Sequence, residues 1–221
     1  MAILPQAVRS LAPVALRDDV RLRAVAVGSG LIPPRTMHSD DDARVLLGAA
    51  EGARQVVEIG VYEGASALEL QRALGPDSHL HLIDPFGRHP DALPRGWGAS
   101  ERATRRQLAR AERRLGARAP VLHWHIALSH EVAVGWREQL DLVFIDGDHS
   151  EAGCERDWLC WHPHVRVGGH VVFHDARADR PGGRGLPGPT AVVARRLRGP
   201  DSGPWEIVAE ADRTVAARRA G

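Results

Sequence analysis

One stretch, residues 56–66 (VVEIGVYEGAS), constrains the fold of this chain more than any other. It opens with β-branched residues, a pattern typical of a parallel strand that is covered on both faces. From Ala65 to Leu74, apolar residues recur at helical spacing. The segment between, Gly60 to Gly64, is therefore predicted to be a tight turn that joins a strand to a helix. Such a turn, followed by the unpaired N–H groups of a helix N-terminus, favours an anionic or polar ligand.

The spacing of the glycines separates two classes of cofactor. A dinucleotide-binding turn needs the pattern G-x-G-x-x-G, but its middle glycine is replaced here by Tyr62, which would crowd a pyrophosphate. The chain has an acidic residue at the strand end instead. This pattern resembles the first motif of class I S-adenosylmethionine-dependent methyltransferases, in which the acid holds the amino-acid end of the ligand. An ordinary strand-to-helix turn of another α/β protein is the alternative. The resemblance implies a cofactor-binding set of Glu58, Gly60, Tyr62, Glu63, Gly64 and Ser66.

A second strand pattern, residues 79–86 (HLHLIDPF), also ends in an acid, Asp84. In a doubly wound sheet, the carboxylate at the end of the next strand lies beside the glycine turn, where it can accept two hydrogen bonds from a ribose diol. Asp84 is thus a further candidate for cofactor binding. In the methyltransferases that the chain resembles, the turn after the third strand borders the adenine, which adds Ser129 as a candidate.

The order of the patterns predicts the fold class. Five strand-and-helix units are followed by two strand-like segments, 205–209 and 214–217, that are expected to form an antiparallel hairpin. We therefore expect a doubly wound, Rossmann-like α/β fold with a seven-stranded, mostly parallel sheet and helices on both faces. The strands are expected at 56–59, 79–86, 121–126, 141–148 and 170–174, and the helices at 40–53, 65–74, 100–115, 152–161 and 190–197.

Length and charge limit the classes of function. A chain of 221 residues suits one catalytic domain, here 40–221, preceded by an N-terminal helical cap and lid segment, 1–39. The net charge of +1 leaves no basic footprint for nucleic acid, and no apolar run is long enough for a membrane span. Cys154 and Cys160 are expected to be free thiols in the cytoplasm. We expect a small-molecule acceptor and a homodimer.

Two glycine- and proline-rich segments are expected to be loops near the site. Residues 87–98 are the first candidate for a lid, and residues 178–189 are a second mobile segment. Trp97 in the first could stack on the face of a sugar. The helix between them, 100–115, carries arginines around much of its circumference and is expected to face solvent or another subunit.

Acids and imidazoles follow the fourth and fifth strands. The fourth strand ends in Asp146-Gly147-Asp148-His149, and the fifth ends in His174-Asp175. Neighbouring parallel strands bring these ends together, and close carboxylates repel unless a cation lies among them. Coordination of a divalent metal, with oxygen ligands that suit magnesium, is the simplest resolution. The alternative is that these acids cap helices.

Four segments together, VEIGVYEGAS, LIDPFG, FIDGDHS and VGGHVVFHD, resemble the macrocin-type sugar O-methyltransferases over residues 32–175. The resemblance implies that Asp146 and Asp175 bind magnesium, with Asp146 also near the cofactor, and that His149 is the general base. His174 stands where macrocin-type members have an acid, and Ala176 where catechol-type relatives have Asn. Either His174 joins the metal ligands or metal binding is weaker than in the family.

The function that these patterns favour is transfer of a methyl group from S-adenosylmethionine to a hydroxyl of a small molecule, with a sugar favoured over a catechol. A histidine is tuned to accept a proton near neutral pH, which suits His149. The remaining histidines are expected to be structural. The alternatives of another class are an NAD-linked oxidoreductase and a non-catalytic ligand-binding module on the same fold.

Overall fold

The computed structural model describes residues 19–88, 99–200 and 202–221. The first part of the predicted cap, residues 1–18, and most of the predicted lid with Trp97, residues 89–98, lie outside the described residues. No helix of the described ranges is long and apolar enough to cross a membrane.

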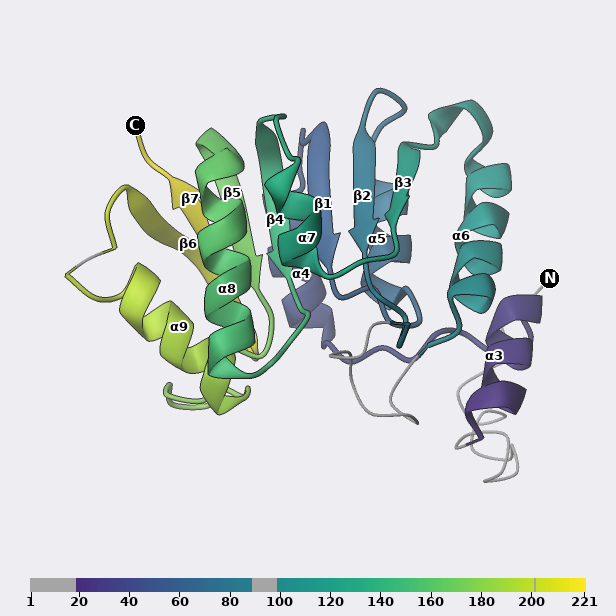
Figure 1. Cartoon of the computed structure of the whole chain (residues 1–221), viewed down its shortest axis with the longest axis horizontal. Coiled ribbons are helices and arrows are strands. Elements are labelled where there is room, and N and C mark those ends of the chain that lie inside the picture. The colour runs from purple at the N-terminus through teal and green to yellow at the C-terminus, as the bar shows by residue number, and fades with distance from the viewer. Residues whose placement is uncertain (1–18, 89–98, 201) are drawn as a thin grey trace.

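A single seven-stranded sheet of order β3-β2-β1-β4-β5-β7-β6 forms the centre of the molecule (Figure 1), which confirms the predicted fold class. The first five strands are parallel to their neighbours, and β7 runs antiparallel to both β5 and β6. The strands are β1 (Gln55–Ile59), β2 (His79–Ile83), β3 (Val121–His125), β4 (Leu140–Ile145), β5 (Val165–Phe173), β6 (Trp205–Ala211) and β7 (Thr214–Arg219).

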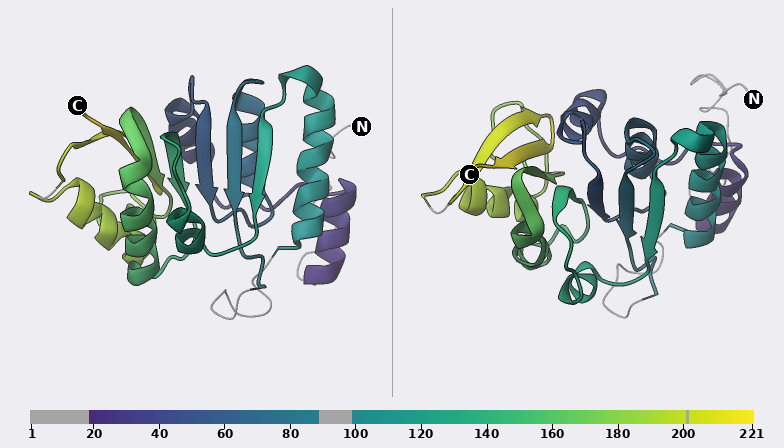
Figure 2. Two further views of the ribbon diagram at one scale, coloured as in Figure 1. Left: turned by 45° about the horizontal axis from the view of Figure 1, so that its top comes forward. Right: turned by 90° about the horizontal axis from the view of Figure 1, so that it is seen from above.

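Helices cover the two faces of the sheet (Figures 1 and 2). One face packs on α4 (Asp40–Ala49), α5 (Ala65–Ala73) and α6 (Glu101–Leu115), and the other on α7 (Ser129–Val134), α8 (Glu151–Trp161) and α9 (Pro187–Leu197). Each face has its own apolar core: Leu70 and Leu108 belong to the first, and Trp158 and Val192 to the second. The near-continuous apolar runs of β1 and β4 follow from this double cover.

Hydroxyl side chains fix where several helices begin. Ser39 accepts a hydrogen bond from the N–H of Asp42, and Asp42 accepts one in return from the N–H of Ser39, which is a reciprocal capping box. Ser100 caps α6 and Ser150 caps α8 through single side-chain bonds. The predicted starts of these helices are thereby confirmed to within a residue.

Several predicted boundaries are wrong, among them the ends of β2, at Ile83 rather than residue 86, and of β4, at Ile145 rather than residue 148. The helix α4 ends at Ala49 rather than Ala53, because the chain turns through Gly52 with a φ of 71°. The strand β5 begins at Val165 rather than His170 and includes the Gly168-Gly169 pair. The helix α9 begins at Pro187, whose missing N–H is tolerated in a first turn.

The N-terminal segment is held against the rest of the domain. Its helix, α3 (Val20–Ser29), lies beside α6 (Figure 1) and extends past Gly28, so the predicted loop starts only at Gly30. Arg110 of α6 donates to the carbonyl oxygens of Val27, at 2.9 Å, and of Gly28. The arginine-rich helix therefore faces the N-terminal segment rather than solvent alone.

Candidate active site

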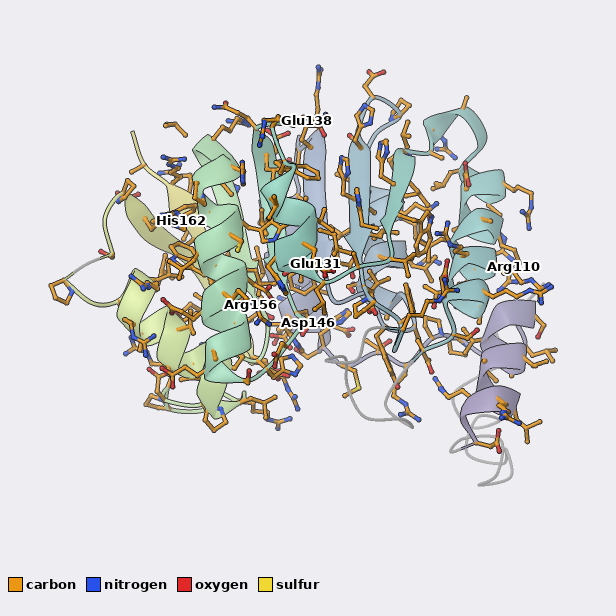
Figure 3. All side chains as sticks on the ribbon, viewed as in Figure 1. Arg110, Glu131, Glu138, Asp146, Arg156 and His162 are labelled. Carbon is orange, nitrogen blue, oxygen red and sulfur yellow. The ribbon has the colours of Figure 1, made fainter. Side chains whose placement is uncertain are left out.

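The carboxyl ends of the central strands meet along one edge of the sheet. The first residue after each strand donates its N–H to the last residue of a neighbouring strand: Gly60 to Ile83 at 2.9 Å, Asp84 to His125 at 3.1 Å, Asp146 to Ile59 at 2.9 Å and His174 to Ile145 at 3.1 Å. The predicted convergence of Asp84, Asp146 and His174 with the glycine turn is thus confirmed. In Figure 3 the labelled Asp146 lies at this edge.

Both glycines of the turn have left-handed backbone conformations, with φ of 88° at Gly60 and 79° at Gly64. A β-carbon on Gly60 would lie 2.1 Å from the carbonyl oxygen of Asp146, and one on Gly64 would lie 2.9 Å from the side chain of Thr104. That the two glycines also admit a ligand stays a prediction. They permit the close approach of β4 and of α6, and glycine is needed there with or without a cofactor.

Glu58 is fully buried at the end of β1. Its Oε1 accepts a hydrogen bond from the hydroxyl of Ser66, and its Oε2 has no partner. Burial raises the pKa of this carboxyl to about 8, although the Ser66 hydroxyl opposes the shift. An unpartnered buried carboxylate oxygen fits a cationic donor, as the ammonium group of S-adenosylmethionine would be. Two predicted cofactor residues are thus brought together, and Ser66 orients the buried carboxyl of Glu58.

Asp84 organises the turn. Its Oδ2 accepts the N–H of Val61 at 2.9 Å and of Tyr62 at 2.8 Å, and its Oδ1 accepts the N–H of Phe86 at 2.7 Å. Burial raises the pKa of Asp84 against these backbone bonds. Tyr62 takes a φ of 51°, an uncommon conformation for a bulky residue, and the carboxylate of Asp84 stabilises it. Binding of a ribose by Asp84 stays a prediction, since these three bonds leave little of its accepting capacity free.

Glu63 and Ser129 were predicted to contact the cofactor, but their side chains are used elsewhere. Glu63 accepts two hydrogen bonds from Arg23, at 2.5 and 2.6 Å, and one from the N–H of Arg35 at 2.6 Å. It therefore ties the N-terminal segment to the turn. The buried hydroxyl of Ser129 bonds to the carboxyl of Asp157, whose pKa burial raises to about 6. Cofactor contact by Glu63 and Ser129 stays a prediction.

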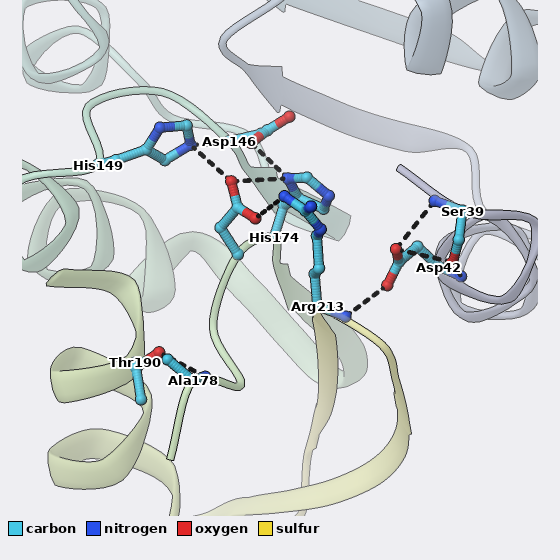
Figure 4. A network of polar contacts seen from close by, with 9 residues as sticks. Ser39, Asp42, Asp146, His149, His174, Ala178, Thr190 and Arg213 are labelled. Atoms are coloured by element: carbon cyan, nitrogen blue, oxygen red, sulfur yellow. Dashed lines mark hydrogen bonds and ion pairs between the residues drawn. The ribbon is translucent and has the colours of Figure 1, made fainter. Parts of the chain in front are cut away.

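Two carboxylates and two imidazoles form a compact cluster at the ends of β4 and β5 (Figure 4). Asp146 Oδ1 lies 3.1 Å from His149 Nε2 and 3.0 Å from His174 Nδ1. Asp175 Oδ2 lies 3.8 Å from His149 Nε2 and 3.6 Å from His174 Nδ1. His174 is 2 % exposed, whereas the side chain of His149 is 38 % exposed and can meet a ligand.

Electrostatics within the cluster favour ion pairs. Burial would raise the pKa of Asp146, but the neighbouring His174 and His149 lower it to about 2. The hydrogen bond to Asp146 raises the pKa of His149. For His174, burial would lower the pKa, but Asp146 outweighs burial and raises it. His149 is consequently a stronger base than a solvated histidine.

Arg213 is a member of the site that the sequence did not indicate. It lies in the turn between β6 and β7, and its Nη1 is 3.0 Å from Asp175 Oδ1. Its backbone N–H donates to the buried Asp42 at 2.9 Å (Figure 4). Asp175 has a φ of 52°, so the guanidinium helps to stabilise a strained residue. A single arginine in a predicted hairpin turn carries no local signal, because only the sheet order places it beside β5.

The donor set of the cluster fits a divalent metal. One ligand atom from each of Asp146, His149, His174 and Asp175 lies within 4.8 Å of every other. In His174, Nδ1 faces the carboxylate of Asp146, and the other ring nitrogen, Nε2, is buried without a hydrogen-bond partner. The residues that could hold a metal are thus the predicted Asp146, His174 and Asp175, with His149 adjacent.

Two neighbouring features differ from the sequence interpretation. Asp148 points away from the cluster, since it accepts the N–H of Ser150 at 2.9 Å and lies 3.9 Å from Arg156. The segment after β5 was predicted to be a mobile loop, but the N–H of Ala178 donates to Thr190 at 3.1 Å, and that of Leu186 to the carbonyl oxygen of Asp175 at 2.7 Å. This segment is therefore bonded to both α9 and the site.

Solved structures share the fold. The O-methyltransferase TomG from Streptomyces achromogenes, involved in tomaymycin synthesis and bound to SAM, has a TM-score of 0.60 at 19% identity over 92% of this chain and 91% of its own. An O-methyltransferase from Bacillus cereus in complex with SAH has a TM-score of 0.59 at 18% identity over 97% of this chain and 96% of its own. An rRNA methylase from Streptococcus thermophilus has a TM-score of 0.52 at 11% identity over 84% of this chain and 100% of its own. The fold alone therefore does not determine the acceptor.

The sequence itself gives the family. Residues 57–176 match the family described as a methyltransferase domain. The match begins in β1, the strand before the glycine turn, and ends at the residue after Asp175. The match includes the buried Glu58, the turn, and all four members of the cluster. It spans more than half of the 221 residues. The chain belongs to the methyltransferase-domain family.

Proposed function

We propose that this protein is an S-adenosylmethionine-dependent O-methyltransferase that acts on a hydroxyl of a small molecule. The observation that carries the proposal is the buried Oε2 of Glu58, which lacks a partner at the end of the strand that leads into the glycine turn. The names of the O-methyltransferases of similar fold, one bound to SAM and one to SAH, support the same cofactor.

The chain's own residues supply the two parts of such a reaction. Glu58, oriented by Ser66, binds the ammonium end of the cofactor and so fixes the direction of its methyl group. The Nε2–H of His149 donates to the ionised Asp146, so the ring accepts the proton of the acceptor hydroxyl at Nδ1. As the oxygen forms its bond to the methyl carbon, the bond between that carbon and the sulfur breaks, and the sulfur keeps the electron pair. Alignment and proton removal are the main requirements of this displacement.

We also propose that Asp146, His174 and Asp175 hold a divalent metal. When bound, the metal would lower the pKa of the acceptor hydroxyl. Magnesium is the ion that the sequence favoured, but an imidazole among the ligands suits Mn²⁺ or Zn²⁺ better than an all-oxygen site does. Turnover after chelation, with each metal added back separately, tests both statements. Full activity of the exhaustively chelated enzyme would remove the metal from the reaction.

The roles of the two histidines are separated by paired variants. His149→Ala should lower turnover by about 10²–10⁴-fold and leave cofactor affinity nearly unchanged, because a general base acts only in the chemical step. His174→Ala should instead weaken metal binding. Normal turnover of His149→Ala at saturating substrates would dismiss it as the base. Loss of turnover, cofactor affinity and melting temperature together would identify a structural residue.

For the acceptor we propose a sugar or a glycosylated metabolite, on the resemblance to macrocin-type enzymes. A catechol or another natural product is the alternative within the same chemistry. A panel of saccharides and catechols, assayed for S-adenosylhomocysteine release, decides between them. Turnover of catechols with none of any saccharide would reverse the order.

A further inference from the structure

Four histidines form a ladder on β2 and β3, away from the cluster at the strand ends. In the register of the two parallel strands, His81 lies opposite His123, with His79 and His125 two residues to either side. The intervening residues, Leu80, Leu82, Leu122 and Trp124, belong to the core beneath α5 and α6. Since side chains alternate along a strand, the four imidazoles share the opposite face of the sheet.

Two pairs of ring nitrogens face each other across the strands. His79 Nδ1 lies 2.9 Å from His123 Nε2, and His81 Nδ1 lies 3.2 Å from His125 Nε2. We call these the outer and the inner pair. The rings also stack along the ladder, with 4.3 Å between the centroids of His81 and His123 and 11° between their planes. The ladder is thus a repeated arrangement with fixed ring orientations.

The two pairs differ in their surroundings. The inner pair packs against the indole of Trp136, whose ring centroid is 4.7 Å from that of His81, and His81 is buried. His79 and His123 of the outer pair are both partly exposed. Among the described elements, no helix covers the face of β2 and β3 opposite α5 (Figure 1). Solvent therefore reaches the outer pair.

Burial and mutual repulsion favour the neutral form of three rings of the ladder, His81, His123 and His125. Burial is the main cause that lowers the pKa values of His81, His123 and His125, and neighbouring histidines add to it. The carboxylate of Glu138 acts in the opposite direction on His123. Neutral imidazoles offer the lone pairs that a metal needs, so little competition from protons is expected near neutral pH.

We propose that His79 and His123 form a second metal site, one that binds a borderline transition-metal ion such as Ni²⁺, Cu²⁺ or Zn²⁺. Metal-to-nitrogen bonds of about 2.0–2.1 Å place two ligand nitrogens roughly 2.9–3.4 Å apart in square or tetrahedral geometry. The outer pair has this separation before any ion binds. Two imidazoles without a carboxylate among them suit these ions and not magnesium or calcium.

Binding rearranges one proton. In the bare pair, one of the two facing nitrogens carries the hydrogen that the other accepts. A metal needs both lone pairs, so in each ring the proton occupies the nitrogen that faces away from the pair. The total number of protons is unchanged, and binding to the neutral pair therefore releases none.

The site is separate from the cluster at the strand ends. His79 is the first residue of β2, and the strand then runs to Ile83 beside Asp84. Five residues of extended chain span roughly 16 Å. Glu138, whose charge acts on His123, lies at the opposite edge of the sheet from Asp146 in Figure 3. A metal on the outer pair therefore does not depend on the proposed methyl transfer.

Titration of the full-length protein with Ni²⁺, followed by calorimetry, tests the proposal. His79→Gln and His123→Gln should each weaken one binding event by about tenfold or more, since each removes one of two protein ligands. His149→Gln should leave that event unchanged and affect only binding at the strand ends. His164→Gln, a partly exposed histidine outside the ladder, is the matched control. Unchanged Ni²⁺ affinity in both His79→Gln and His123→Gln would overturn the proposal of a second site. Loss of Ni²⁺ binding in His149→Gln alone would overturn it as well.

A second measurement on the unaltered protein covers the case in which a ladder variant does not fold. Substoichiometric Ni²⁺ should broaden the ring resonances of His79 and His123 before those of His164. Broadening confined to His149 and His174 would place the only ion at the strand ends and refute the proposal.

Discussion

Glu58 combines a buried carboxyl, an unpartnered oxygen and a pKa raised to about 8. Without a cofactor it therefore carries a proton at pH 7, where about nine-tenths of such groups are protonated. An arriving ammonium group favours the ionised form. Cofactor binding at pH 7 should accordingly release close to one proton, and calorimetry in buffers of different ionisation enthalpy measures it. Binding without proton release would show that Glu58 does not meet the ammonium group.

The matching variant is Glu58→Gln, which keeps the shape and removes the charge. Its cofactor affinity should fall by about 10–100-fold, the equivalent of a charged hydrogen bond of about 1.5–3 kcal/mol, and its proton release should vanish. Ser66→Ala removes only the residue that orients Glu58 and should have a smaller effect in the same assays.

Arg213 offers a test of how the site is held together. Its guanidinium is the partner of Asp175, whose side chain is 9% exposed. Arg213→Met should cost roughly 1–3 kcal/mol of stability and lower turnover, because it removes the guanidinium that pairs with Oδ1 of a nearly buried carboxylate. Arg218→Met in the same hairpin breaks an ion pair whose side chains are 50% and 61% exposed, and is expected to cost at most about 1 kcal/mol. Equal losses for the two variants, by chemical denaturation, would contradict this account.

At the scale of the element, the histidine ladder makes β2 and β3 sensitive to acid. Burial lowers the pKa of His81 to about 3, while an unfolded histidine titrates near 6.5. Between these values the unfolded chain binds the proton and the folded chain does not, so stability should fall as the pH drops from about 6.5 towards 3. The loss that His81 contributes is on the order of a few kcal/mol. His81→Gln should flatten the dependence in denaturation curves at several pH values. If the unfolding free energy of His81→Gln depends on pH as steeply as that of the unaltered protein, His81 takes up its proton without unfolding.

Individual elements were predictable where the pattern is local. The strand that leads into the glycine turn, the helix after it, and the acids at strand ends follow from periodicity and turn residues within about ten positions. Arg213 was not predictable, because it reaches Asp175 through a crossover of the sheet. The contact between Arg23 and Glu63 was not predictable either, because it joins residues 40 positions apart in the sequence. The alternating histidines at 79, 81, 123 and 125 were visible in the sequence, but only the pairing of β2 with β3 turns them into a ladder.

Across the whole molecule, the N-terminal segment is tied to the cofactor turn by one buried ion pair. The side chains of Arg23 and Glu63 are only 14% and 10% exposed. Glu63→Gln should loosen residues 19–39 while the sheet stays intact. Limited proteolysis followed by mass spectrometry should then show faster cleavage in that segment, at an unchanged melting temperature of the core. Glu206→Gln, in an exposed pair, is the control. Cleavage at the rate of the unaltered protein would mean that other contacts hold the segment.

The position of Arg213 in the chain also sets an order of assembly. The glycine turn, the acids after β4 and the histidine after β5 are all synthesised before the hairpin of β6 and β7, yet Asp175 obtains its guanidinium only from that hairpin. Asp42, near the start of the domain, likewise obtains the N–H of residue 213 at the end. During translation, the residues of the glycine turn can thus fold before Arg213, the partner of Asp175, has been synthesised. The contacts of Asp175 are therefore complete only once β6 and β7 have joined the sheet.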